Sequence, residues 1–104
     1  MREFTTPPTT VTARLVGGVL TAIFDGVPYE RQIMSIVVNC SPTSVVNVYR
    51  GAVSPASQIG THPVGNQNTY MPPNRDVIPA GFPMFVTWPT ATSGSAIAVF
   101  KGRM

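Results

Sequence analysis

Residues 32–40, QIMSIVVNC, are the stretch that decides the fold class of this chain. They hold four β-branched aliphatic side chains and neither glycine nor proline, a composition typical of a strand at the centre of a β-sheet. A serine–proline turn at residues 41–43 follows, and residues 44–50, SVVNVYR, are predicted to be the partner strand. Two apolar strands joined by a short turn predict a β-protein built around this region.

Further strands are predicted on both sides of this pair, because apolar or alternating runs recur between clusters of turn-forming residues. They cover residues 11–15, 19–24, 82–88 and 95–101, and a shorter run starts at residue 27. Gly17 and Gly18 form a two-residue hairpin signal between the first two of these strands. About seven strands without any helical period predict an all-β fold, an antiparallel β-sandwich or jelly roll.

The first ten residues, 1–10, are predicted to be an extended arm in front of a β-sandwich domain that covers residues 11–104. Pro7 and Pro8 remove backbone donors and push their neighbours into extended conformations, so this segment cannot be helical. Phe4 is the only large apolar side chain in it apart from Met1. Such an arm either stays a free tail or lies along a neighbouring subunit, where Phe4 would be its anchor.

The charge content is low, with seven Lys or Arg and four Asp or Glu, or 11% of the residues. A typical soluble domain carries about 25% charged residues. A polar but uncharged surface can be buried against another protein at little desolvation cost, since few ions must leave water. The cations are scattered singly along the chain, whereas nucleic-acid binders gather them in a stripe or patch. These features favour a protein partner and predict no nucleic-acid partner.

Residues 51–73 break the strand pattern with repeated prolines and glycines, and only one short strand is predicted there, near residues 69–71. Long irregular loops are usually functional, so this segment is expected to contact a partner. Tyr70 and Met71 lie in it, and Phe82 borders the following turn. With Phe4, these residues are the predicted interface. Tyr70 and Phe82 could instead form a platform for a glycan, or cap the core.

Residues suited to catalysis are scarce. His62 is the only histidine, and no zinc-ligand spacing, Gly-x-Ser-x-Gly elbow or phosphate-binding glycine loop is present. Of the four acids only Glu30 and Asp76 could act as a pair, and each has an arginine next to it in sequence, which favours a solvated surface role. The chain is therefore expected to have no catalytic residues, no metal and no cofactor, and not to be an enzyme.

Cys40 is the single cysteine, so no disulfide can form within the chain. A small buried residue at a strand end is the favoured interpretation, over a reactive thiol. The longest apolar stretch, residues 15–24, has ten residues, about half of what a transmembrane helix needs. Neither a membrane partner nor a signal peptide is expected.

A resemblance to a known class appears in the C-terminal two thirds of the chain. Residues 44–51, SVVNVYRG, are followed by the polar loop and then by residues 77–81, VIPAG, which lead into residues 85–88, FVTW, and a Thr/Ser/Gly turn. This order resembles small β-sandwich structural proteins of tailed bacteriophages, and the likeness covers residues 33–100.

What the resemblance implies is a virion component assembled in the host cytoplasm. The leading expectation is a capsid decoration or cement protein that stabilises the head by binding across capsid subunits, with the major capsid protein as its partner. Such proteins are often trimeric and carry extended arms, so a homo-oligomer, with a trimer favoured, is expected. A head-fibre, collar or tail-appendage module and a glycan-binding module are the alternatives.

Overall fold

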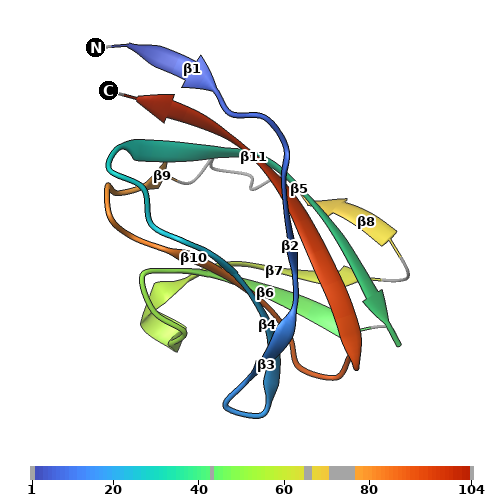
Figure 1. Cartoon of the computed structure of the whole chain (residues 1–104). Helices are drawn as coiled ribbons and strands as arrows, with labels where there is room; N and C mark the ends of the chain where they lie inside the picture. Colours follow the sequence, from blue (N-terminus) through green and yellow to red (C-terminus); the bar gives the residue numbers. More distant parts are fainter. Residues whose placement is uncertain (1, 43, 65–66, 71–76, 104) are drawn as a thin grey trace.

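The computed structural model describes residues 2–42, 44–64, 67–70 and 77–103. Two antiparallel sheets pack face to face in it (Figure 1), which confirms the predicted all-β sandwich. The strands are β1 (Glu3–Thr5), β2 (Thr9–Thr12), β3 (Arg14–Val16), β4 (Val19–Phe24), β5 (Glu30–Ser41), β6 (Ser44–Arg50), β7 (Gln58–Val64), β8 (Gln67–Tyr70), β9 (Val77–Ile78), β10 (Met84–Trp88) and β11 (Ser93–Arg103), with one 3-10 turn, η1 (Pro55–Ser57). No helix among these residues is long and apolar enough to cross a membrane.

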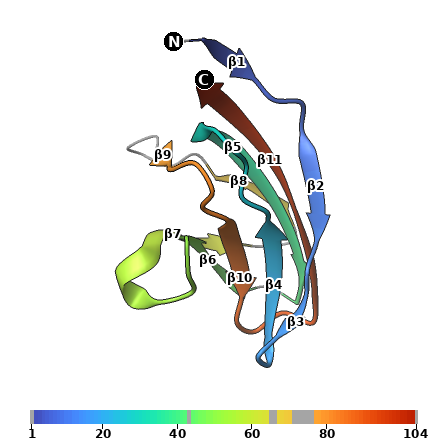
Figure 2. The same ribbon diagram turned by 60° about the vertical axis from the view of Figure 1, so that its left-hand side comes forward.

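We call the two layers sheet A and sheet B. In sheet A the long strands β5 and β11 are central; β1 and β2 pair with the free side of β11, and β8 and β9 with the free side of β5. In sheet B the order is β3-β4-β10-β6-β7. Figure 2 shows the two layers nearly edge-on. The predicted central strand is therefore confirmed as β5.

The predicted pairing of β5 with the next strand was wrong. β5 pairs with β11 in sheet A, while β6 pairs with β10 and β7 in sheet B, so the chain changes sheets between β5 and β6. The strand predicted over residues 11–15 is likewise divided at Ala13, with β2 in sheet A and β3 in sheet B. The hairpin between β3 and β4 is confirmed, and Gly17 and Gly18 have the positive φ values of 58° and 82° that its tight turn requires.

The N-terminal segment is extended, as its prolines predict, and it lies along a strand of its own chain. β1 and β2 both pair with β11 of the same chain. Between them the Thr6 N–H donates to the Phe100 carbonyl (2.8 Å) and the Phe100 N–H donates to Thr6 Oγ1 (3.1 Å). The two chain ends consequently lie side by side at one end of the sandwich (Figure 1).

Side-chain contacts hold β1 in place. The Phe4 ring meets the Tyr29 ring edge-on with 5.0 Å between centroids, and it lies where a Cβ on Gly102 would otherwise be. Glu3 forms ion pairs with Lys101 (3.4 Å) and Arg103 (3.0 Å), and Arg103 also lies 3.8 Å from Glu30. Because these charged groups are more than a third exposed, solvent screens their attraction.

We expect Glu3→Gln to lower the free energy of unfolding by less than about 1 kcal/mol, the usual range for exposed ion pairs. Phe4→Ala should cost more, because it removes a half-buried ring from its contacts with Gly102 and Tyr29. Urea denaturation of the two variants measures this order. An equal or larger loss in Glu3→Gln would show that charge, not ring packing, holds β1.

The predicted irregular segment 51–73 contains more regular structure than expected. β7 pairs along β6 at the edge of sheet B, and β8 pairs with β5. β8 corresponds to the short strand predicted near residues 69–71. β7 was not predicted because Gly60 and Pro63 interrupt its strand pattern. An edge strand tolerates proline, because the backbone N–H groups on its unpaired side make no hydrogen bonds to a neighbouring strand.

The core is formed by the inward faces of both sheets. Alternate residues of β5 and β11 from one side meet alternate residues of β4, β6 and β10 from the other. The largest fully buried side chains are Trp88, Ile33, Ile36, Ile78 and Met84. Cys40 is buried among them with 6% exposure, as predicted for a small structural residue.

Candidate interaction surfaces

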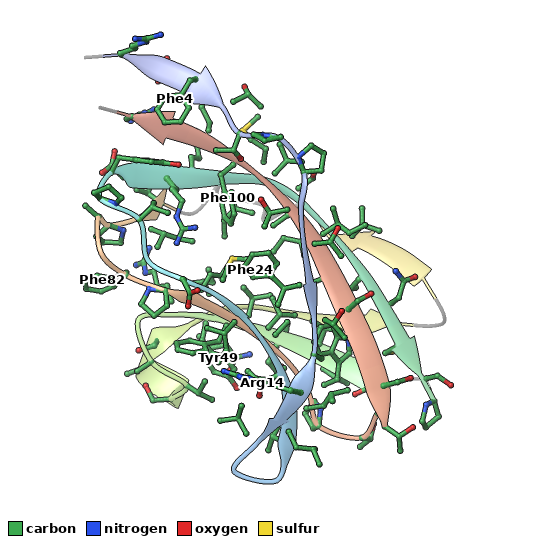
Figure 3. The ribbon with its side chains drawn as sticks, in the orientation of Figure 1. Phe4, Arg14, Phe24, Tyr49, Phe82 and Phe100 are labelled. Atoms are coloured by element: carbon green, nitrogen blue, oxygen red, sulfur yellow. The ribbon has the colours of Figure 1, made fainter. Side chains whose placement is uncertain are left out.

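Phe4 and Phe82, the two predicted interface residues whose side chains the structure describes, lie apart from each other. Phe4 packs within its own chain on Gly102 and Tyr29, and Figure 3 shows it well away from Phe82. Tyr70 is placed by its backbone on β8, opposite Ile36 of β5. Met71 lies outside the described residues.

Phe82 is exposed, at 45%, as its position beside a turn predicted. It follows Gly81, whose φ is 83°, and its ring covers Gly51, where an added Cβ would lie 3.0 Å from the ring. A groove of about 380 Å³ runs beside it. The groove is lined by Arg50, Gly51, Ala52, Ser57, Gly81, Phe82 and Pro83.

Two arginines from different sheets donate hydrogen bonds to the backbone of residues 77–83, the segment that contains Phe82. Arg31 of β5 donates from Nη2 to the Phe82 carbonyl (3.0 Å), and Arg50 of β6 donates from Nη1 to the Val77 carbonyl (2.6 Å). The Gly81 N–H adds a bond to the Val27 carbonyl (2.7 Å). Bonds from both layers fix residues 77–83, so the Phe82 ring is presented on a rigid base.

A second surface is the outward side of sheet B, which we call the sheet B face. The strand register places Ile23, Phe85 and Tyr49 in one row across β4, β10 and β6. The next row runs through Arg14, Thr21, Thr87 and Asn47. Thr21 and Thr87 lie on this side but are each 3% exposed. The sheet B face therefore comprises the other five residues with Val16, Val19 and Val45, which are 45%, 37% and 46% exposed.

Charge is nearly missing from the sheet B face. Arg14 is the only charged side chain among the residues that define it. Asn47, a polar residue of this face, already has hydrogen-bond partners within the chain. Its Oδ1 accepts from Thr61 Oγ1 (2.9 Å) and from Gln58 Nε2 (3.4 Å). The outer side of sheet A is different, because Glu3, Lys101, Arg103 and Glu30 gather there in a network of ion pairs.

Sequence reasoning did not find the sheet B face. Tyr49 and Phe85 lie inside predicted strands, yet they are only half-buried and lie on the outer side of the sheet. Their alternation with Val48 and Val86, which are 1% and 0% exposed, is the signal that could have shown it. Which side of a strand faces outward depends on which sheet covers it.

Groups that could support catalysis are not assembled in the part of the chain that is described. No cluster of three or more His, Cys, Asp or Glu side chains occurs in it. His62 is placed only by its backbone, on β7 opposite Val46. Asp76, one of the two acids considered as a pair, lies outside the described residues, while Glu30 is on the outer side of sheet A beside Arg103.

No family model and no curated protein matches this chain. Among solved structures, the catalytic domain of a GH87 α-1,3-glucanase in complex with tetrasaccharides matches with a TM-score of 0.50 and 11% identity. The match covers 90% of this chain and 21% of the glucanase, so the chain spans about a fifth of that structure. At this identity the likeness concerns the fold, and it agrees with the β-sandwich described above.

Two further similar structures have lower TM-scores. The virus-like particle of the extra small virus of the giant freshwater prawn Macrobrachium rosenbergii matches with a TM-score of 0.40 and 10% identity, over 98% of this chain and 80% of that one. The CBM36-1 domain of a multidomain xylanase from the hindgut metagenome of Trinervitermes trinervoides matches with 0.41 and 9%, over 94% and 98%. The solved structures that resemble this chain thus include viral capsid proteins and domains of carbohydrate-active enzymes.

Proposed function

We propose that this chain is a non-enzymatic structural protein of a virion, which decorates a phage capsid and stabilises the head by binding across capsid subunits. The observation that carries the proposal is the sheet B face, a nearly uncharged sheet surface with half-exposed aliphatic and aromatic side chains. The resemblance of residues 33–100 to small phage β-sandwich proteins is the reason for placing the protein on a phage capsid. The partner is the major capsid protein, and the decorating unit is a homo-oligomer, with a trimer favoured.

The composition of the sheet B face suits a protein partner. The centres of protein interfaces are depleted in charge and enriched in aromatic residues, as the row of Ile23, Phe85 and Tyr49 is. Burying this row and Val45 removes apolar surface from water at about 25 cal/mol per Å². Arg14 is the only charged side chain of the face that would leave water, so the desolvation cost is small.

The distribution of charge indicates which sheet would face the capsid shell. The ion-paired residues Glu3, Glu30, Lys101 and Arg103 are on the outer side of sheet A, opposite the sheet B face. Charged groups are best left in water, so sheet A faces solvent and sheet B faces the shell. Repetition over a symmetric shell then makes contacts of moderate strength collectively strong when the units are linked.

Charge placed on the sheet B face should abolish decoration. We expect Val16→Lys/Val45→Lys to bind capsids at least about ten-fold more weakly, because two unpaired ammonium groups would have to be desolvated. Both positions are about half exposed, so the variant should still fold. Co-sedimentation with capsids that lack this protein measures the binding.

The matched control is Thr5→Lys/Thr12→Lys, which adds the same charge on exposed positions of β1 and β2 in sheet A. It should sediment with capsids as the unmodified chain does. Equal capsid binding by the two doubly substituted chains would contradict the proposal that sheet B faces the shell.

A glycan-binding module is the second candidate, and the exposed Phe82 ring beside its groove is the observation that favours it. A flat aromatic face on a rigid base can stack on a sugar ring. If this candidate holds, Phe82→Ala removes binding to a glycan array and leaves capsid binding intact. If the array shows no bound glycan that depends on Phe82, the candidate fails.

A further inference from the structure

The edge strand β3 is exposed wherever its neighbour β4 does not cover it. All three of its residues are exposed, and β4 is its one strand partner in the described part of the chain. Leu15 and Val16 are 71% and 45% exposed, although both are aliphatic. The β3–β4 hairpin projects from one end of the sandwich (Figure 1), and a Cβ on Gly17 or Gly18 would meet nothing within 4 Å. An apolar strand is thus left uncovered at the edge of sheet B.

The backbone at the centre of β3 has hydrogen-bonding groups that β4 does not use. Both glycines of the β3–β4 turn have positive φ, so the turn is a two-residue turn of type I′. Such a turn is closed by a hydrogen-bonded pair, here Val16 with Val19, and hydrogen-bonded and non-hydrogen-bonded pairs alternate along antiparallel strands. The pair of Leu15 with Leu20 is therefore not hydrogen-bonded. The N–H and C=O of Leu15 point away from β4, toward the open edge of sheet B.

Leu15 is also the uncovered end of a row of core side chains. The register places Trp88, Leu20 and Leu15 next to one another across β10, β4 and β3, on the side of sheet B that faces sheet A. Their exposure rises along the row, from 0% and 5% to 71%. The last side chain of the row is therefore apolar, on the core side and still in water, so covering it would stabilise a contact at this edge.

We propose that β3 pairs with β3 of a second copy of this chain, in antiparallel orientation and centred on Leu15. The N–H of Leu15 in each copy donates to the Leu15 carbonyl of the other, so the same strand supplies the donor and the acceptor that the contact needs. The two Leu15 side chains lie side by side and extend the core row of one copy into the next. Sheet B then continues through both molecules, as when an extended peptide adds a strand to an open sheet edge.

The position of the charge in β3 favours a second copy as the partner. Arg14 is the only charged residue of β3, and the antiparallel register places it opposite Val16 of the second copy. Like charges directly opposite each other destabilise a strand pair, and this register avoids them. The contact is also closed, because it uses the β3 edge of both copies. At the other edge of sheet B, β7 contains Pro63, which has no backbone donor for a further strand.

The role of this pairing on a capsid rests on the proposed function, whereas the pairing itself does not. Directly opposite residues of a strand pair lie on the same side, so the sheet B faces of the two copies point in the same direction and can meet one shell together. Neighbouring decorating units would then be joined by their β3 edges across two-fold positions of the shell. Strands of three residues bury less than the about 1,200–2,000 Å² of a standard interface, so the contact is weak alone and gains strength on the shell.

Self-association of the full chain tests the pairing without capsids. Sedimentation velocity from about 10 µM to about 1 mM should show a reversible step that doubles the mass of the smallest species. Leu15→Asp should weaken this step at least about ten-fold, because it brings two carboxylates together at the centre of the contact. Leu15 is 71% exposed, so the variant should still fold. Val53→Asp, which charges another exposed apolar residue (54%) away from β3, is the matched control and should associate normally.

Leu15→Pro tests the backbone part of the contact. Proline lacks the N–H that the second copy would use, while the hydrogen bonds between β3 and β4 stay intact because Leu15 makes none of them. The variant should keep the circular dichroism spectrum of the unmodified chain and lose the doubling step. A folded Leu15→Pro chain that still doubles would overturn the proposal, as would an unmodified chain that shows no doubling step.

A disulfide between copies locates the contact and decides the case if Leu15→Pro does not fold. In the proposed pair the two Leu15 Cα atoms are about 5.5 Å apart, a separation that a disulfide can span. Under mild oxidation Leu15→Cys should form covalent pairs at least about ten-fold faster than Val53→Cys. Both variants retain Cys40, which is buried and gives the same background. Equal rates in the two variants would overturn the proposal.

Capsid binding distinguishes a failure of this inference from a failure of the proposed function. Leu15 points to the opposite side of β3 from Arg14 and Val16, so Leu15→Asp leaves the sheet B face unchanged and should still sediment with capsids. Weaker capsid binding of Leu15→Asp with unchanged self-association would mean that the open edge pairs with a capsid strand, and the second-copy proposal would fail. An unmodified chain that does not bind capsids would contradict decoration and leave the pairing of isolated chains untouched.

Discussion

Trp88→Ala is expected to lower the free energy of unfolding by about 3–5 kcal/mol, the range for truncating a large buried aromatic residue. A domain of this size has about 5–15 kcal/mol in total, so the variant should be close to unfolding at room temperature. Trp88 ends β10, is fully buried between the sheets, and its ring fills the space in front of Gly94, where a Cβ would lie 3.2 Å away. Urea denaturation followed by circular dichroism measures the loss.

Trp88→Phe is the matched control. It keeps an aromatic ring in the core and removes the indole Nε1, which is buried and has no hydrogen-bond partner among the described residues. The smaller cavity and the loss of an unsatisfied donor act in opposite directions, so we expect less than half the cost of the alanine variant. A Trp88→Ala chain that lost under about 1 kcal/mol would mean that the two sheets can close over the missing ring.

Gly26→Ala is expected to be the most damaging of the glycine-to-alanine changes, at about 2–3 kcal/mol, because it forces two backbone segments apart. An added Cβ would lie 2.7 Å from the carbonyl carbon of Gly81 and closer still to its oxygen. The Gly81 N–H also donates to the Val27 carbonyl (2.7 Å), which ties these connections together. Neither side can yield by a side-chain rotation.

Gly102→Ala is the informative comparison. Its Cβ would approach the Phe4 ring as closely, at 2.7 Å from Cε2, but a ring on an edge strand can rotate away. We expect this variant to lose about 1 kcal/mol or less and to release β1, seen as faster amide exchange at Glu3–Thr5 with the remaining sheet unchanged. Equal losses in the two variants would contradict the distinction between backbone and side-chain contacts.

Several parts of the fold could be predicted from local pattern. The β-branched run in β5 predicts a buried strand, and Gly17 with Gly18 predicts the β3–β4 hairpin, because both depend on neighbours in sequence. Pairing partners could not be predicted in this way. A short connection after β5 is compatible with a hairpin and equally with a crossing to the opposite sheet, and the chain crosses.

The candidate sites show the same limit. The exposed position of Phe82 next to a turn was predicted. Phe4, another of the predicted interface residues, packs on Gly102 of its own chain, a contact that no local pattern indicated. Glu30 next to Arg31 suggested a solvated pair, but adjacent residues of a strand point to opposite sides. Glu30 therefore lies outside near Arg103, and Arg31 lies inside above Phe100.

The order of residues alone determines that the chain is a β-protein with few charges and little material for acid–base chemistry, since strand propensity, turn chemistry and composition act over a few neighbouring residues. The three-dimensional arrangement alone decides which side of each strand meets the core, where the N-terminal segment binds and which arginine lies in the interior. These depend on contacts between segments up to about a hundred residues apart, such as Glu3 with Arg103, and a local pattern carries no information about them.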